Sequence, residues 1–264
     1  MRRKATEGNR RRREGARAWS PAFLGLLLPS IAFLGLPSPL AADSFSAINQ
    51  LTSAASLKPF ARDLGGLMGS DSFHTARPLG FSGFELSADD AVQFAPDPND
   101  TILRAGGAKP LWLPMAQADI GMPYRFDGFV RGTSYQGLTM AGGGLRYGLL
   151  KTNDKSWAPQ LLAVLEGDVA SDPYFSATHY GGGIAASMGN RFIAPYLGAG
   201  FDATRVTVGS DAADSALNGT SVSVLEPRFT AGTQIVLRTF VYAHLSYVYM
   251  HRQNGAQGGL GVRF

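Results

Sequence analysis

The sequence contains no cysteine. This absence excludes disulfide bonds, thiolate metal sites and a cysteine nucleophile. Histidine is also scarce, and His74, His179 and His251 show no metal-ligand spacing with one another, so the sequence predicts no zinc site. We therefore expect no cofactor and no bound metal, and look for function in the pattern of apolar and polar residues.

Charged residues are few, at 17% of the chain, and they are unevenly distributed. Residues 1–42 hold eight of the 24 basic residues and two of the 20 acidic ones, which leaves 16 basic and 18 acidic residues in the remainder. The positive net charge therefore comes from the leading segment. Its arginine run, 10–13, could indicate nucleic-acid binding. Because an apolar stretch follows the run directly, we expect no nucleic-acid partner.

That apolar stretch, residues 22–36, is short for a membrane-spanning helix and contains Pro29. A basic region, an apolar region and small residues before Asp43 are typical of a secretory signal peptide. The sequence therefore predicts a signal peptide over residues 1–42 and export of the rest of the chain.

Residues 43–79 have helical periodicity, interrupted at Lys58-Pro59. Proline is tolerated in the first turn of a helix, so we expect two short helices followed by a linker, with Gly65-Gly66 as a weak point. We interpret this segment as a plug inside a barrel or a periplasmic clamp. A mobile amphipathic leader, or a helix lying on the membrane surface, is the alternative. The expected plug contacts are Leu57, Phe60, Leu64 and Leu67.

From Gly80 onward the apolar residues alternate with a period of two, which indicates β-strands with two different faces. The 33 glycines suit a tightly curved barrel, where inward side chains must be small. Eight strands in place of ten are the alternative, if neighbouring segments fuse. The ten segments are about 80–94, 110–123, 125–135, 138–150, 158–168, 173–187, 191–208, 222–236, 239–251 and 255–264.

The last segment alternates apolar or small residues with polar or small ones and ends on Phe264. It resembles the closing strand of bacterial outer-membrane β-barrels, whose terminal phenylalanine is part of the signal read by the assembly machinery. The resemblance implies an antiparallel transmembrane up-and-down barrel over residues 80–264, in the outer membrane of a Gram-negative bacterium, with Phe264 as the assembly signal. Outer-membrane lipids, lipopolysaccharide and the barrel assembly machinery are then the expected partners, and the oligomeric state is left open.

Two long polar connections, 95–107 and 209–221, follow the first and seventh strands, whereas the connections after even-numbered strands are mostly short. Outer-membrane barrels have short periplasmic turns and longer external loops, so these two connections are expected outside the cell. Their acids could bind divalent cations that bridge lipopolysaccharide, or could simply be solvated. The acids in question are Asp97, Asp100, Asp211 and Asp214.

Strand alternation also assigns the faces of the barrel. The apolar set of each strand is expected to face lipid, whereas a soluble sandwich or lipocalin would bury it. Buried charges need partners and ten strands enclose a narrow space, so we favour a filled or partly filled lumen over an open polar pore. We expect the runs Gly142–Gly144 and Gly181–Gly183 to make room for an inserted helix. The charges expected inside are Glu85, Asp119, Arg131, Arg146, Glu166, Asp168, Asp202, Glu226, Arg228 and Arg263.

His244-Leu245-Ser246 resembles the His-x-Ser element of outer-membrane lipid A deacylases, in which base and nucleophile share a strand face. That family's acidic partner would fall near Gly258, where this chain has Gln257 and no carboxylate. A histidine without an orienting group is a poor base, so His244 and Ser246 are weak catalytic candidates and we expect no enzyme.

Three functions remain. The first is a small passive channel or a carrier of apolar solutes with a helical plug, similar in layout to lipid-transport barrels that carry an amino-terminal plug. The second is a structural or surface-display barrel with a filled lumen and acidic external loops. The third is a lipid-modifying hydrolase that uses His244 and Ser246. Filling of the lumen distinguishes the first from the second.

Overall fold

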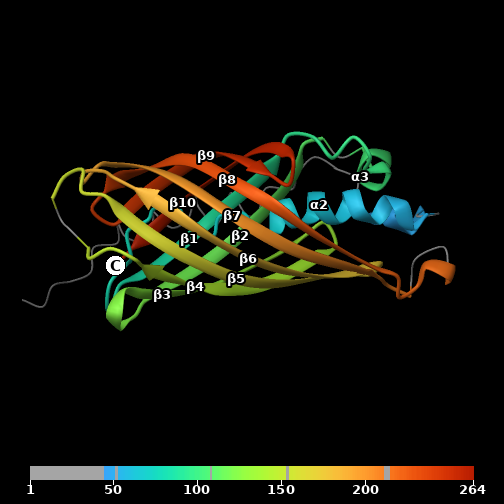
Figure 1. Ribbon diagram of the computed structural model, residues 1–264, viewed down its shortest axis with the longest axis horizontal. Helices are drawn as coiled ribbons and strands as arrows, with labels where there is room; N and C mark the ends of the chain where they lie inside the picture. Colours follow the sequence, from blue (N-terminus) through green and yellow to red (C-terminus); the bar gives the residue numbers. More distant parts are fainter. Residues whose placement is uncertain (1–44, 51–52, 108, 153–154, 211–214) are drawn as a thin grey trace, which may run out of the picture. The chain divides into compact units, whose positions relative to one another are not determined.

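The computed structural model describes residues 45–264 apart from 51–52, 108, 153–154 and 211–214 (Figure 1). The predicted signal peptide, together with Asp211 and Asp214, lies outside the described residues. In the described part of the chain, no helix is long and apolar enough to span a membrane.

Ten antiparallel strands form a closed barrel, as the sequence predicts. Each strand pairs with its neighbour in the chain, and β1 pairs with β10 to close the ring. The topology is therefore up-and-down. The strands are β1 (Phe84–Gln93), β2 (Leu111–Gly121), β3 (Phe126–Tyr135), β4 (Leu138–Gly148), β5 (Gln160–Asp172), β6 (Phe175–Ser187), β7 (Ile193–Val208), β8 (Ser221–Arg238), β9 (Val241–Met250) and β10 (Gln253–Arg263).

The two ends of the barrel differ. At one end β1 begins and the chain ends, with Phe84 and Phe264 exchanging two backbone hydrogen bonds of 3.2 and 2.8 Å; we call this the terminal mouth. The other end, the loop mouth, carries the long β1–β2 and β7–β8 connections, and the first of these contains α3 (Thr101–Ala105). The other three connections at the loop mouth span only 136–137, 173–174 and 251–252, whereas 149–159 at the terminal mouth is longer than these. Loop length therefore distinguishes the two mouths less sharply than the sequence pattern suggests.

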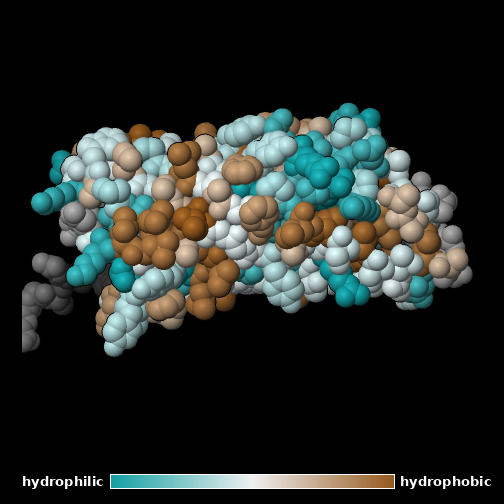
Figure 2. Space-filling view, viewed as in Figure 1, coloured by the Kyte–Doolittle hydropathy of each residue, from teal (hydrophilic) through white to brown (hydrophobic). Residues whose placement is uncertain are grey.

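The outer wall is apolar and the inner wall is polar. In β9, for example, Leu245 is 65% exposed whereas its neighbour His244 is 5% exposed. The same alternation exposes Leu165, Phe201 and Leu225 on the outside of β5, β7 and β8. Figure 2 shows hydrophobic side chains exposed along the barrel wall.

Among residues 45–83, the structure describes three helical elements ahead of the barrel: η2 (Ser46–Gln50), η3 (Ala54–Ser56) and α2 (Leu57–Met68). The expected weak point at Gly65-Gly66 is wrong, because α2 runs through both glycines without a break. They allow close approach to the wall instead: a Cβ at Gly65 would lie 2.1 Å from Thr204 Oγ1, and one at Gly66 would lie 3.2 Å from Met250 Cγ.

Helix α2 lies inside the barrel at the loop mouth. It contacts β1 and β2 on one side of the ring and β7 and β8 on another, and all four strands present inward-facing residues to it. The four expected plug contacts have no exposed surface and join one apolar cluster with inward-facing side chains of the wall. The wall's members of this cluster include Leu111, Leu113, Met115, Met140, Phe175, Val206, Val208 and Val224.

The glycine runs do not make room for the helix, contrary to expectation. A Cβ at Gly142 would lie 1.9 Å from Asp168 Oδ1, and one at Gly181 would lie 2.4 Å from Glu166 Oε1. The space is occupied by side chains of the neighbouring strand. Gly198 on β7 does make room for the amino-terminal segment, because a Cβ there would lie 2.2 Å from the ring of Phe73.

The contact between Gly65 and Thr204 gives a test of helix position. In an unconstrained helix, Gly65→Ala would add roughly 0.5–1 kcal/mol of stability. Here we expect it to lower the urea midpoint of unfolding, because the new Cβ would clash with Thr204. Thr204→Gly, although destabilising alone, should partly rescue Gly65→Ala in a double-mutant cycle. Additive effects of the two changes would contradict this packing.

Candidate functional site

A cluster of buried charges lies where α2 ends within the barrel. The last carbonyls of a helix have no intrahelical donors and carry partial negative charge, so cations stabilise them. Three wall arginines donate to carbonyls in this part of the amino-terminal segment. We call these three, Arg131, Arg146 and Arg228, the latch.

Arg131 on β3 joins the end of α2 to a carboxylate two strands away in the wall. Its Nε and Nη2 donate to the two carboxylate oxygens of Asp168 on β5, at 2.8 and 2.6 Å. Nη1 donates to the carbonyl of Ser70 at 2.6 Å, and Nη2 also donates to that of Met68 at 2.8 Å. Glu166 lies 3.0 Å from the same guanidinium, whose side chain has no exposed surface. Arg131 is therefore fully committed to the wall and the plug.

Arg228 on β8 makes the corresponding contacts from the other side. Its Nε donates to Asp202 Oδ2 on β7 at 2.7 Å. Its Nη2 donates to the carbonyls of Gly66 and Gly65 at 3.0 and 3.3 Å, and Nη1 donates to Ser70 Oγ at 3.2 Å. The carboxylate neutralises the arginine while the arginine satisfies the helix end.

Arg146 on β4 holds the chain just beyond α2. Its Nε donates to the carbonyl of Ser72 at 2.7 Å, and its Nη1 pairs with Asp119 on β2. The guanidinium also lies over the ring of Phe129, 4.4 Å from the centroid. The latch thus fixes residues 65–72 to three strands of the wall, β3, β4 and β8.

A glycine in the intervening strand lets Arg131 and Asp168 meet. Register places Arg131, Gly142 and Asp168 in one row across β3, β4 and β5. A side chain at Gly142 would collide with the Asp168 carboxylate. The inward glycine therefore allows charges two strands apart to pair.

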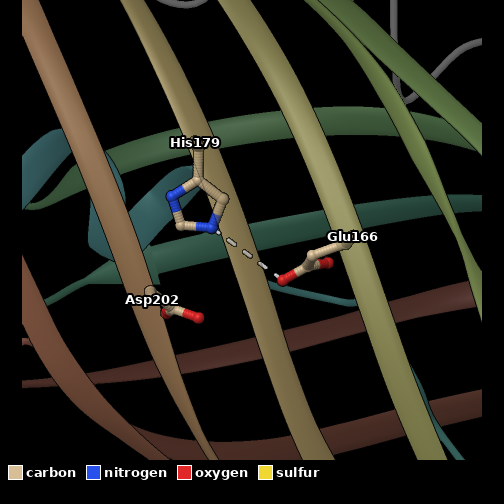
Figure 3. Close-up of side chains that lie close together, drawn as sticks. All are labelled: Glu166, His179 and Asp202. Carbon is tan, nitrogen blue, oxygen red and sulfur yellow. Dashed lines mark ion pairs between the residues drawn. The ribbon is translucent and has the colours of Figure 1, made fainter.

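Glu166, His179 and Asp202 converge from β5, β6 and β7 (Figure 3). Their potential ligand atoms lie within 4.8 Å of one another, with His179 Nε2 at 3.9 Å from Glu166 Oε1. His179 Nδ1 is hydrogen-bonded to Thr204 Oγ1 at 2.9 Å. Both carboxylates already contact latch arginines, so a metal ion here would have to share them with two guanidinium groups.

At the loop mouth, Asp63 on α2 is buried against the β1–β2 connection. Its carboxylate accepts hydrogen bonds from Gln93 Nε2 at 2.7 Å and from the backbone of Asp97 at 2.8 Å. Burial raises the pKa of Asp63 to about 8 despite these two bonds, and the neighbouring Asp100 adds to the rise. Burial likewise raises the pKa of Asp100 to about 6. At neutral pH the plug therefore holds a proton at this contact.

The expectation that Asp97 and Asp100 could bind a bridging cation is not favoured by their contacts. Asp97 accepts from the backbone of Asn99 at 2.8 Å and lies 3.4 Å from Arg62. Asp100 caps α3 by accepting from the Leu103 amide at 2.9 Å. Both carboxylates serve the fold of the loop and its contact with the plug.

Nearer the terminal mouth, Glu85 on β1 is surrounded by donors. Arg263 Nε and Tyr242 Oη each donate to it at 2.6 Å, and His74 Nε2 lies 3.0 Å away. The His74 ring stacks between those of Tyr242 and His244, with centroids at 4.7 and 5.1 Å. The linker beyond α2 is therefore also packed into the lumen.

His244 does have a carboxylate partner, contrary to the sequence analysis. Asp89 Oδ1 lies 2.9 Å from His244 Nε2 across Gly259, although the two residues are 155 positions apart. Nδ1 of His244 has no hydrogen-bond partner among the described residues, so the ring is not bonded to Ser246. Both side chains face the lumen and are buried, away from the apolar outer wall. No assembled nucleophile–base pair results.

The other predicted site residues are placed as follows. Nine of the ten predicted lumen charges are buried inside the barrel, whereas the side chain of Arg263 is 32% exposed near the terminal mouth. Glu226 on β8 pairs with Arg62 of α2 at 2.6 Å and with Arg252 at 3.1 Å. Phe264 is 59% exposed and its ring lies 6.3 Å from that of Phe240.

Several functional contacts were missed by sequence reasoning. Asp89 could have been found, because it alternates in phase with Glu85 on β1. Arg62, Asp63 and His74 could not have been found, because the helical periodicity of this segment concerns its apolar residues alone. Their partners lie on distant strands, and only the fold brings them together.

The chain matches no protein-family profile, and no curated protein matches it. Solved structures similar to it include bacterial outer-membrane barrels. The attachment invasion locus protein Ail of Yersinia pestis is 14% identical, with 70% of this chain and 99% of that chain covered and a TM-score of 0.32. The amino-terminal barrel domain of Pseudomonas aeruginosa OprF is 15% identical, with 70% and 99% covered and a TM-score of 0.35.

The transport unit of the autotransporter AIDA-I from Escherichia coli is 11% identical, with 86% of this chain and 99% of that chain covered and a TM-score of 0.34. At these identities the likeness concerns the fold alone. The chain is a closed ten-strand antiparallel barrel, and the solved structures similar to it include barrels of the bacterial outer membrane.

Proposed function

We propose that this chain is an integral outer-membrane barrel whose lumen is closed at rest by its own residues 57–79, and that it forms a passive channel when this plug is displaced. One observation carries the proposal: the latch arginines bind both the wall carboxylates and the carbonyls of residues 65–72. Removal of the plug would leave a lumen lined by charge.

The apolar outer wall supports the membrane location. Only helices and closed barrels satisfy every backbone polar group within a bilayer, and the ring here is closed by β1 and β10. Exposed side chains such as Leu165, Phe201 and Leu225 would be costly in water and suit lipid.

The filled lumen supports closure at rest. A cavity lined by Phe73, Gly198 and Asp202 has a volume of about 20 Å³, and a second, lined by His74 and Glu85, has about 10 Å³. Each has room for no more than about one water molecule. The charged lining favours ions and small polar solutes over apolar ones, because an apolar solute would have to strip water from these groups.

A structural or display role is the second candidate. Its support is the same filling of the lumen, together with the β1–β2 connection, which contains α3 and its cap at Asp100. A lipid-modifying hydrolase is disfavoured, because His244 and Ser246 are buried and not hydrogen-bonded to each other.

The membrane location predicts a depth-dependent cost on the outer wall. Leu165→Arg, in the middle of β5, should destabilise the barrel in phospholipid vesicles by about 2–4 kcal/mol, whereas Leu237→Arg, near the end of β8, should cost about 0–1 kcal/mol. Urea unfolding in vesicles measures both. Equal, small costs for the two variants would argue against a lipid-facing wall.

The latch predicts which variants conduct. In planar bilayers the unchanged mature chain should give no current. The double variant Arg131→Met/Arg228→Met should conduct, because the loss of both guanidinium groups leaves buried carboxylates and helix carbonyls unpaired. Each broken pair should cost about 3–5 kcal/mol. Arg205→Met, at an exposed arginine of β7, is the matched control and should stay silent.

A disulfide lock separates the two candidate functions. The Ser56 and Thr101 hydroxyls lie 2.8 Å apart, and the chain has no native cysteine, so Ser56→Cys/Thr101→Cys can pin the start of α2 to the loop. In the latch variant, oxidation of this pair should suppress the current and reduction should restore it. Silence from both the latch variant and a deletion of residues 43–79 would instead favour the display barrel.

The Asp63 contact predicts pH-dependent docking of the plug. The pKa of Asp63 is about 8 in the docked plug against an ordinary 3.8. The stabilisation of the docked plug by the protonated Asp63 is therefore complete below about pH 4 and is lost as the pH rises towards 8. The maleimide labelling rate of Leu64→Cys, divided by that of the exposed control Ala55→Cys, should therefore rise over this range. Asp63→Asn should flatten the rise. A ratio that does not change with pH when Asp63 is present would refute pH-dependent docking through this residue.

A further inference from the structure

The amino-terminal segment runs the whole length of the lumen. At the loop mouth, Ser56 contacts Thr101 and the ring of Phe60 lies 5.0 Å from that of Phe175, the first residue of β6. At the terminal mouth, the Ala76 amide donates to Ser187 Oγ at 3.1 Å, and Ser187 is the last residue of β6. The segment therefore enters at one end of β6 and leaves at the other.

Between these points the contacts descend in chain order. Residues 65–72 meet the latch near the middle of the strands. Leu79 donates to Asp127 at the start of β3 with a distance of 3.0 Å, and β1 begins shortly afterwards at Phe84. The segment passes the lumen once and does not fold back.

The described residues that precede α2 consequently lie at the loop mouth, opposite the start of β1. Phe45 and Ile48 are buried there in the same apolar cluster as Phe60, and the ring of Phe45 lies 6.3 Å from that of Phe175. A plug that entered from the side of β1 and folded back would place Phe45 at the terminal mouth. In this structure Phe45 lies at the loop mouth.

The loop mouth is the external one if the barrel follows the usual orientation, with both ends of the strand array on the periplasmic side and the longer loops outside. The connections 94–110 and 209–220 both lie at this mouth. The orientation rests on the proposed function.

We infer that the barrel threads residues 45–79 through its lumen, from the periplasmic side at Leu79 to the cell surface, and holds the Phe45 end of this segment outside the membrane. The lumen provides polar partners along the whole segment. Arg62 pairs with Glu226, His74 contacts Glu85, and carbonyls between these two residues accept hydrogen bonds from the latch. Beyond closing the lumen, the barrel then displays the end of this segment that begins at Phe45.

Epitope tags test the inference in intact cells. One tag is inserted directly before Phe45, a second at Gly219 in the β7–β8 connection, and a third between Ser156 and Trp157 in the β4–β5 connection. Antibody should label the first two on intact cells and the third only after permeabilisation. Labelling of the Phe45 tag only after permeabilisation would overturn surface display, whether the Gly219 tag or the tag before Trp157 is labelled on intact cells.

A disulfide test separates threading from membrane orientation. Ser56→Cys/Thr101→Cys should form a crosslink in the exported protein, whereas Ser56→Cys/Ser187→Cys, which pairs α2 with the far end of β6, should not. The reverse result would show that the segment is not threaded. A correct crosslink with the Phe45 and Gly219 tags both hidden would refute display, and conductance of the latch variant remains an independent test of the channel.

Discussion

A narrow closed barrel leaves almost no water beside the charges on its inner wall, and the rest of this structure depends on that constraint. An isolated buried charge costs several kcal/mol, so each one must find a partner or take up a proton. Arg131 meets Asp168 and Glu166, Arg228 meets Asp202, and Arg146 meets Asp119. Each of these arginines also donates to a carbonyl of the amino-terminal segment. The plug is therefore part of the charge balance of the wall.

Glycine is what makes the pairing geometrically feasible. Neighbouring inward side chains on adjacent strands are close, but the charged partners here lie two strands apart. Gly142 stands between Arg131 and Asp168, and Gly259 stands between Asp89 and His244. In both rows a side chain on the middle strand would occupy the position of the carboxylate. The high glycine content thus reflects side-chain reach across the wall as well as the curvature of the barrel.

The strand count and the two faces could be predicted because a strand has a fixed period of two, and residues such as Leu165 and Glu166 reveal their faces within a few positions. Pairing could not be predicted in the same way. His244 and Asp89 are 155 positions apart, and their contact depends on the register of β9, β10 and β1. Helix propensity misled for a related reason: Gly65-Gly66 look weak in isolation, but the wall packs against them and α2 continues. The position of the plug follows from tertiary contacts that no local pattern encodes.

The two kinds of contact on the plug have different roles. Buried ion pairs roughly break even against apolar packing, so the latch alone is weak evidence of tight binding. Leu57, Phe60, Leu64 and Leu67 each bury a whole side chain, at about 1.5–3 kcal/mol apiece, and these contacts favour the helix inside the barrel. They are non-directional and would tolerate sliding. The arginines are directional: a shift of one helical turn, about 5.4 Å, would take the carbonyls of Gly66 and Met68 out of reach of Arg228 and Arg131. Apolar packing therefore keeps the segment in the lumen, and the charges determine the depth at which it stops.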